Sequence, residues 1–145
     1  MIYPDSEQIH RTYNETIKVS GGGAAGILKQ GCIESIIDFI KNDLYYPEME
    51  DKLTHLVFSV NKNHCFQDGN KRIAISLGAH FLLLNGYVFL VPKFIREMEN
   101  ISYHVASGAI DKDLLKRVIF SILYESEFDE VLKLELYHLL SQEAK

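Results

Sequence analysis

The chain has 145 residues, the usual length of one domain and enough to bury a core without disulfides or a metal ion. Its net charge of −5 excludes a general electrostatic attraction to nucleic acid or anionic lipid, so any cationic site must be local. The 47% hydrophobic content, with no low-complexity tract, predicts a single globular domain over residues 1–145.

No segment of the sequence has the pattern of a signal peptide or of a membrane-spanning helix. The start, "MIYPDSEQIHR", has no charged stretch followed by an apolar one. The most apolar run, residues 73–84, is too short to cross a bilayer. The two cysteines, Cys32 and Cys65, have neither metal-ligand nor redox-motif spacing, and so few thiols are typical of a reducing cytoplasm. We therefore expect a cytoplasmic protein that binds no membrane and no nucleic acid directly.

The first half of the chain contains three helical patterns. The first covers residues 5–19, where apolar residues recur every four positions. It stops at the Gly-rich "SGGGAAG", residues 20–26, which lacks the Lys-Ser/Thr ending of a phosphate-binding loop and is expected to be a plain connection. The second pattern covers residues 32–43 and breaks at the proline that follows. The third covers residues 48–63 and ends just before His64.

The second half contains four further helical patterns. One covers residues 70–85, is almost wholly apolar, and ends at an Asn-Gly pair that favours a left-handed C-cap. Then "YVFLV", residues 87–91, has the composition of a short strand. Amphipathic segments follow over residues 93–107, 111–125 and 128–142. The sequence therefore predicts an all-α helical bundle around a central apolar helix, with at most one short strand or hairpin.

The stretch "HCFQDGNKR", residues 64–72, has the residue types of an anion-binding site. Lys71 and Arg72 fall in the first turn of the apolar helix, where the helix dipole disfavours each cation by about 0.3–1 kcal/mol. A phosphate group would reverse this penalty, because free main-chain N–H groups and both cations would face it. Gly69 would let the anion approach the backbone closely, and Asn70 could donate from its amide.

Two further residues of this stretch extend the site toward catalysis. Asp68 would repel a bare phosphate, so we expect it to hold a divalent cation such as Mg²⁺ that bridges it to a nucleotide. A histidine exchanges protons near neutral pH, and His64 is suited to take a proton from an attacking hydroxyl. Taken singly, each residue also has a structural explanation, as a helix cap or an exposed charge. The prediction rests on their combination within one short stretch.

These residues also carry a resemblance to a known family. "HCFQDGNKR" resembles the signature of the Fic/Doc superfamily, His-x-Phe-x-Asp/Glu-Gly-Asn-Gly/Lys-Arg, and Lys71 is typical of its death-on-curing (Doc-type) branch. The segments "GILKQGCIESII", "LYYPEMEDKLTHLVFSVNKNHCF" and "FLLLNGY" are similar to segments found in the same order in death-on-curing proteins. The resemblance covers residues 20–87 and implies an all-α Fic fold. Cys65 stands where the signature commonly has proline, and we expect it to serve in packing.

The resemblance implies transfer of part of ATP to a hydroxyl of a target protein. His64 would deprotonate a serine or threonine of the target, Asp68 would hold Mg²⁺, and Phe66 would be structural. The phosphate groups of ATP would be bound by Gly69, Asn70, Lys71 and Arg72.

Three activities are compatible with this resemblance. Doc-type toxins are associated with phosphorylating a threonine of elongation factor Tu, which arrests translation, and with neutralisation by a separate antitoxin protein. The alternatives are a protein adenylyltransferase and a catalytically silent binding module. Adenylylating members usually have glycine and a second arginine where this chain has Lys71 and Ile75, so phosphate transfer is favoured. The oligomeric state stays open.

Two other segments have weaker functional patterns. "NDLYYPEME", residues 42–50, is expected to fall where the family has a flap that aligns the target peptide, although its tyrosines could equally anchor the next helix. "SILYES", residues 121–126, partly resembles a self-inhibitory motif with Glu125 as the blocking carboxylate. Chance explains that spacing better, so we expect inhibition by a separate chain.

Overall fold

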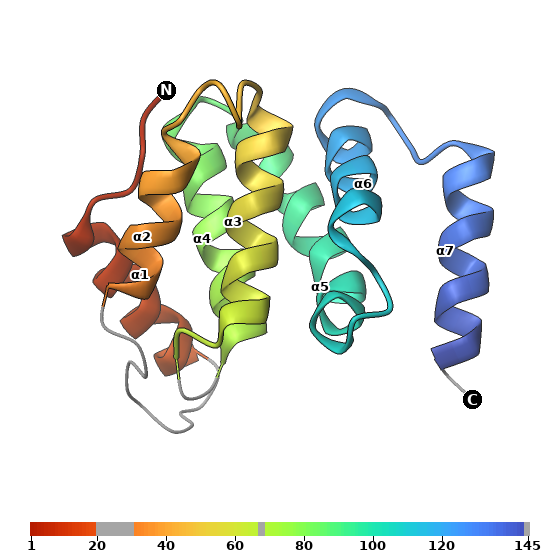
Figure 1. Cartoon of the computed structure of the whole chain (residues 1–145), viewed down its shortest axis with the longest axis horizontal. Coiled ribbons are helices and arrows are strands. Elements are labelled where there is room, and N and C mark those ends of the chain that lie inside the picture. Colours follow the sequence, from red (N-terminus) through yellow and green to blue (C-terminus); the bar gives the residue numbers. More distant parts are fainter. Residues whose placement is uncertain (20–30, 67–68, 144–145) are drawn as a thin grey trace.

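The computed structural model describes residues 1–19, 31–66 and 69–143, and these form seven α-helices, one short 3₁₀-helix and no strand (Figure 1). The elements in chain order are α1 (Ser6–Val19), α2 (Cys32–Ile40), α3 (Met49–Asn63), α4 (Asn70–Leu84), η1 (Val88–Leu90), α5 (Val91–Ser107), α6 (Lys112–Tyr124) and α7 (Glu130–Glu143). The predicted all-α fold is confirmed. None of the described helices combines the length and the apolar character that crossing a membrane requires.

The strand predicted at residues 87–91 is wrong. The chain there forms η1 and passes directly into α5, which has Pro92 in its first turn. Proline fixes φ in the helical range and removes a donor that a strand would need. The described residues also offer no second strand to pair with, and an unpaired strand is not stable.

Helices α3 and α4 form the centre of the bundle. Figure 1 shows them in the middle, with α1 and α2 on one side, α5 and α6 on the other, and α7 outermost. Helix α4 contacts α1, α3 and α5, while α3 also contacts α2 and α6. On α4 the fully buried side chains include Ile73, Leu77, Phe81 and Leu82. Burial of each such side chain contributes about 1.5–3 kcal/mol.

A buried lysine closes the C-terminal end of α2. The side chain of Lys52 on α3 is 1% exposed, and its Nζ donates to the carbonyl of Ile40 at 2.5 Å and to the carboxylate of Asp43 at 2.7 Å. Burial by itself would lower the pKa of Lys52, but hydrogen bonds with Asp43 and Tyr3 outweigh it and the pKa is raised. A cation at this helix end is also favoured by the helix dipole. This contact fixes the α2–α3 connection against α3.

Gly78 permits the close approach of α4 and α5, and we predict that Gly78→Ala is destabilising. An added methyl group would lie 2.7 Å from Cζ of Phe94, which is fully buried on α5. Helix propensity favours alanine by about 1 kcal/mol, whereas overpacking a core costs about 1–3 kcal/mol. Urea unfolding should show a net loss of up to about 2 kcal/mol.

The matched control for this prediction removes the atoms that the methyl group meets. Phe94→Leu in the Gly78→Ala background should recover part of the lost stability, because leucine lacks the outer ring carbons of Phe94. A Gly78→Ala protein that is more stable than the original by about 1 kcal/mol, the full gain in helix propensity, would show that the α4–α5 contact yields at no cost.

Candidate catalytic site

The motif predicted from the sequence forms the connection between α3 and α4. His64 caps the C-terminal end of α3 with a φ of 49° and a ψ of 55°, a left-handed conformation. It is the only non-glycine residue with positive φ in the described part of the chain, and it is exposed. Such backbone conformations are uncommon away from glycine and cluster at functional positions.

The two residues after His64 are anchored to different helices. Phe66 is 1% exposed and stacks on Tyr13 of α1, with ring centroids 4.5 Å apart and ring planes at 11°. Cys65 is fully buried and forms a disulfide with Cys32, the first residue of α2, with the two Cα atoms 5.5 Å apart. The loop therefore presents an exposed imidazole beside two fixed side chains.

The disulfide differs from the expectation of two thiols. Cys65 is buried as predicted for a packing residue, but it is also covalently bonded to Cys32. The pair is separated by 33 positions, a spacing with no motif signature, so only the fold reveals that α2 begins beside the motif. Their Cα separation lies in the range of about 4.4–6.8 Å that disulfides require.

The side-chain amide of Asn70 is used within the loop. Its Oδ1 accepts from the main-chain N–H of Phe66 at 3.1 Å, and its Nδ2 donates to the carbonyl of Phe66 at 2.9 Å. The amide thus ties the loop to the first turn of α4. Any contact of Asn70 with phosphate would therefore use its main-chain N–H, because the first hydrogen bond of α4 runs from the N–H of Ile73 to the carbonyl of Gly69 at 2.9 Å.

The start of α4 has the geometry of an anion site. Gly69 precedes the helix with a φ of 78°, a conformation that favours glycine, and a methyl group there would lie 3.3 Å from Cδ1 of Ile17. The N–H groups of the next three residues have no acceptor within the helix. They point past the end of α4, where the helix dipole favours negative charge.

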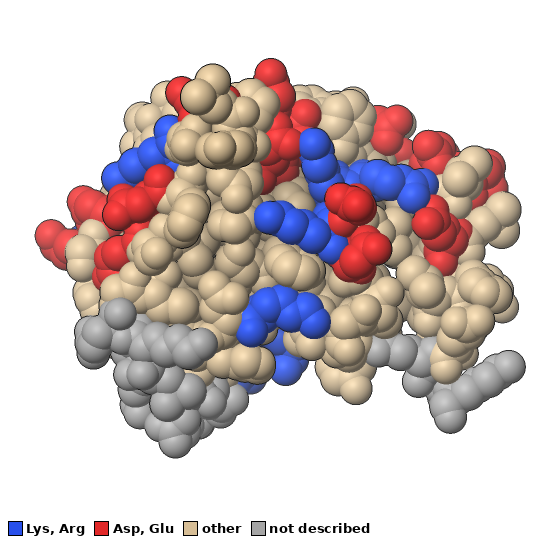
Figure 2. All heavy atoms as spheres, in the orientation of Figure 1, with Lys and Arg blue, Asp and Glu red and all other residues tan. Residues whose placement is uncertain are grey.

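Among the residues that the structure describes, Lys71 and Arg72 have no acidic partner at this end of α4. Both are exposed, the first turn of α4 contains no acidic residue, and neither cation forms an ion pair with a described residue. On the face shown in Figure 2, basic side chains toward the lower edge also lie apart from acidic ones, whereas those in the upper half lie among them. Two unpaired cations at the positive end of a helix favour an anionic ligand.

Two predicted features fall outside the residues that the structure describes. These are Asp68, the predicted Mg²⁺ ligand, and the Gly-rich residues 20–26. Within the described ranges, no group of three or more His, Cys, Asp or Glu side chains could hold a metal ion. The metal role of Asp68 therefore stays a prediction.

Residues 5–82 match the sequence model of the Fic/DOC family, a match that spans just over half of the chain and includes the whole motif. The chain belongs to the Fic/DOC family. A curated relative, "Toxin Doc" of Mycolicibacterium smegmatis (strain ATCC 700084 / mc(2)155), is 27% identical over 99 residues, which cover 66% of this chain and 76% of the relative.

In this Fic/DOC protein the segment predicted to be a flap lies far from the motif. The connection between α2 and α3 enters the N-terminal end of α3, whereas His64 follows its C-terminal end. A helix of 15 residues is about 22 Å long, so residues 42–48 cannot line a groove at His64. The flap prediction is wrong, and the alternative of an anchor is favoured, because the hydroxyl of Tyr46 bonds His55. The flap interpretation followed the resemblance and did not take into account that the predicted helix over residues 48–63 separates this segment from His64.

The structure does not bring Glu125 and Arg72 together. Glu125 is the C-cap of α6, and its carbonyl accepts from Nζ of Lys93 at 2.8 Å. Lys93 lies in the first turn of α5, which follows the C-terminal end of α4, and Arg72 lies at the N-terminal end. The acid motif of residues 121–126 is therefore a chance match.

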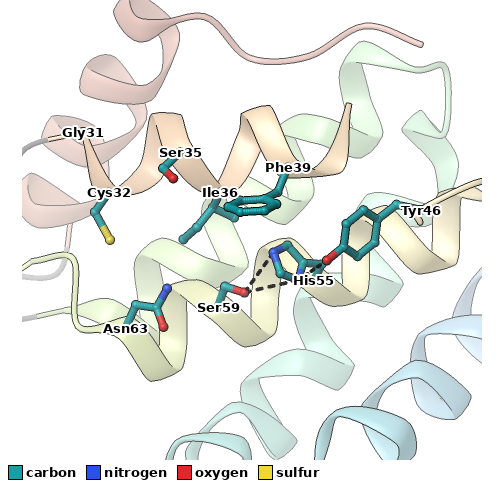
Figure 3. Close-up of a pocket in the computed structure, with 9 residues that line it drawn as sticks. All are labelled: Gly31, Cys32, Ser35, Ile36, Phe39, Tyr46, His55, Ser59 and Asn63. Atoms are coloured by element: carbon teal, nitrogen blue, oxygen red, sulfur yellow. Dashed lines mark hydrogen bonds between the residues drawn. The ribbon is translucent and has the colours of Figure 1, made fainter. Parts of the chain in front are cut away.

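A hollow of about 410 Å³ runs between α2 and α3 of this Fic/DOC protein (Figure 3). It is lined by Gly31, Cys32, Ser35, Ile36, Phe39, Tyr46, His55, Ser59 and Asn63. It extends along α3 as far as Asn63, the residue before His64. Sequence reasoning missed this hollow, because no motif connects its residues and only helix packing brings them together.

His55 is held neutral at the end of this hollow that lies away from Asn63 and His64. Its Nδ1 lies 2.9 Å from Nζ of Lys112 and 3.2 Å from the hydroxyl of Tyr46, and its Nε2 lies 3.4 Å from Oγ of Ser59. Burial, and then the charge of Lys112, lower the pKa of His55 to about 4. Burial also lowers the pKa of Lys112. The neutral ring can therefore accept a hydrogen bond from the ammonium group.

We predict that His55 weakens the fold in mild acid. Its folded pKa of about 4 lies below the ordinary value of 6.5, so between these pH values the unfolded chain binds more protons. The contribution is complete above the ordinary pKa and is lost as the pH falls toward the folded one. With solvent screening it amounts to about 1–2 kcal/mol.

Urea unfolding of the wild type and His55→Gln at about pH 7 and about pH 5 measures this contribution. The variant should lose less stability between the two pH values than the wild type, because glutamine does not titrate. Equal losses in the two proteins would assign the acid sensitivity to other groups, among them His80, whose pKa is also lowered by burial.

Proposed function

We propose that this Fic/DOC protein is a Doc-like toxin that transfers the γ-phosphate of ATP to a serine or threonine hydroxyl of a translation factor similar to elongation factor Tu. The transfer would arrest translation. The observation that carries the proposal is that the exposed, left-handed His64 precedes the start of α4, where Lys71 and Arg72 are exposed and form no ion pair with a described residue. The similarity to a relative named "Toxin Doc" supports it.

The residues of the motif suit the chemistry of phosphoryl transfer. Lys71, Arg72 and the free N–H groups of α4 would bind phosphate oxygens and stabilise the charge that develops on them. His64 would accept the proton of the target hydroxyl as its oxygen forms a bond to the γ-phosphorus. The bond from that phosphorus to the bridging oxygen then breaks, and ADP leaves.

We propose that this site also binds a magnesium ion. Mg²⁺ in nucleotide sites is usually held by one or two carboxylates together with phosphate oxygens, and Asp68 would supply one carboxylate beside the phosphate-binding residues. When bound, the ion would neutralise charge between neighbouring phosphates.

The second candidate function is transfer of AMP to the same hydroxyl. Phosphoryl and nucleotidyl transfer use the same base and differ in which phosphorus faces it. One turn after Arg72, α4 presents Ile75, which is half-buried and lines a groove between α1, α4 and α5. No cation at this position is available to fix a further phosphate, which favours transfer of the γ-phosphate. A catalytically silent binding module is the third alternative.

We also propose that a separate antitoxin protein neutralises this toxin in the cytoplasm. The name of the relative places that protein among toxins. Within the described residues, Glu125, the self-inhibitory carboxylate considered from the sequence, lies at the other end of α4 from Arg72.

ATP labelled separately at the α- and γ-phosphorus tests the proposal. The purified protein is incubated with elongation factor Tu, Mg²⁺ and each labelled ATP, and the label on the factor is counted. Transfer of label from the γ-phosphorus supports kinase activity. Transfer of label from the α-phosphorus instead identifies the protein as an adenylyltransferase. If the protein binds ATP but transfers neither label, only the third alternative, a catalytically silent binding module, remains. A parallel reaction on a whole cell extract shows whether a different protein takes up the label.

A further inference from the structure

We propose that the bond between Cys32 and Cys65 is a reversible thiol switch that positions His64. The disulfide would hold the imidazole where transfer is fast, and its reduction would slow transfer. This inference rests on the proposed role of His64 as the base, and it adds a means of regulation to that site.

The disulfide connects the catalytic loop to a helix that is distant in sequence. Cys65 follows His64 directly and is fully buried, and Cys32 is the first residue of α2. The main chain at His64 is therefore fixed on one side by α3 and on the other by a covalent bond to α2. A residue held between two fixed points in a left-handed conformation responds to movement of either one.

Breaking the bond changes the loop without unfolding it. Bonded sulfurs lie about 2.0 Å apart, whereas non-bonded heavy atoms sit about 3.5–4.0 Å apart. The two sulfur atoms must therefore separate by about 1.5–2 Å on reduction, by side-chain rotation, by movement of the loop, or by both. The stacking of Phe66 on Tyr13 and the amide of Asn70 remain in place, so the loop keeps its other anchors. The displacement is largest at Cys65 and reaches His64, one residue away.

The hollow between α2 and α3 gives a small thiol access to one of the two sulfurs. Cys32 is half-buried and lines the hollow, and Figure 3 shows its sulfur directed from the first turn of α2 toward α3. Ser35, Ser59 and Asn63 add polar groups to the mostly apolar lining of the same hollow. Cys65 is fully buried, so an incoming thiolate attacks the sulfur of Cys32.

The exchange is balanced by a small-molecule thiol and its disulfide. In reduction, a thiolate attacks the sulfur of Cys32, the S–S bond breaks, and Cys65 leaves as a thiolate that takes up a proton. A second thiol displaces the first from Cys32, giving two cysteine thiols and one small-molecule disulfide. Oxidation reverses these steps, and the small-molecule disulfide takes up two electrons and two protons. Disulfides of reducing compartments are usually catalytic or redox-sensing, which fits a reversible role.

The first measurement relates the thiol state to the transfer rate. The wild type is equilibrated in buffers of increasing glutathione to glutathione disulfide ratio and quenched with iodoacetamide in denaturant, so that the buried Cys65 also reacts, and the mass of the protein is measured by mass spectrometry. We expect no adduct in the oxidised protein and two in the reduced protein, with transfer at least about tenfold slower in the latter. Cys32→Ser and Cys65→Ala should transfer at the slow rate in every buffer. Cys32→Ser is the milder variant, because this position is half-buried.

The second measurement does not depend on activity. The ring cross peak of His64 in a ¹H–¹³C NMR spectrum is assigned by its loss in His64→Gln. This peak should differ between the oxidised and reduced wild type and stay constant in Cys32→Ser. The peak of His138, on α7, should be constant in both proteins.

Several results would overturn the switch. One is the presence of two iodoacetamide adducts in every buffer. Another is a His64 cross peak that is the same in the oxidised and reduced protein. The third is a transfer rate that is equal or higher after reduction. If the His64 peak follows the thiol state while no label is transferred in either state, the proposed function fails and the coupling of the disulfide to His64 is upheld.

Discussion

Replacing His64 with alanine is expected to lower the rate of phosphate transfer by about 10²–10⁴-fold, the usual contribution of a general base. The imidazole is exposed at the end of α3, so its loss removes no core contact. Circular dichroism and urea unfolding should therefore show a folded protein. The label-transfer assay with γ-labelled ATP measures the rate.

Two variants separate the imidazole from the backbone at His64. His64→Asn tolerates the left-handed conformation better than alanine, so it tests the loss of the base with the least strain. His138→Ala removes another exposed histidine, on α7, and should leave the rate unchanged. Full activity in both His64 variants would mean that another group takes the proton.

Replacing Arg72 with glutamine is expected to lower kcat/KM for ATP by about 10- to 100-fold, since a charge-assisted hydrogen bond contributes about 1.5–3 kcal/mol. The same change should leave stability unchanged or raise it by about 0.3–1 kcal/mol, because a cation leaves the positive end of α4. Falling activity with constant or rising stability is the signature of a residue placed for a ligand. Initial rates at varied ATP and urea unfolding give the two quantities.

The control for this prediction is Arg96→Gln on α5. Arg96 is exposed and pairs only weakly with the adjacent Glu97, at 3.7 Å, so its loss should change neither quantity. If Arg72→Gln loses stability and keeps its kcat/KM, the guanidinium of Arg72 supports the fold and does not bind phosphate.

The parts of this protein that the sequence predicts are those encoded locally. Each of the seven helices was expected from the spacing of apolar residues, and the motif from 64 to 72 is continuous, so its residues must be neighbours in any fold. The prediction of a strand at 87–91 was wrong because it relied on the β-type composition of these residues and gave too little weight to Pro92, which favours the first turn of a helix.

The parts that the sequence did not predict depend on packing between distant segments. The disulfide needs the start of α2 to lie beside Cys65, and the hollow needs α2 to pack along α3. The residue type of Asn70 indicated a polar contact, but only the fold shows that its amide bonds Phe66. The flap was misplaced because the resemblance was followed without considering the length of the helix that separates residues 42–48 from His64.

The anchoring of the catalytic loop by Tyr13, Cys32 and Asn70 makes its geometry a property of the assembled bundle. A nascent chain that has left the ribosome only as far as Cys65 carries His64 but lacks Asn70. A proteolytic cut that releases α1 removes the stacking partner of Phe66 while leaving every motif residue intact. The geometry of the loop should therefore be lost together with the fold, and incomplete or nicked copies of the protein should transfer little label in the assay.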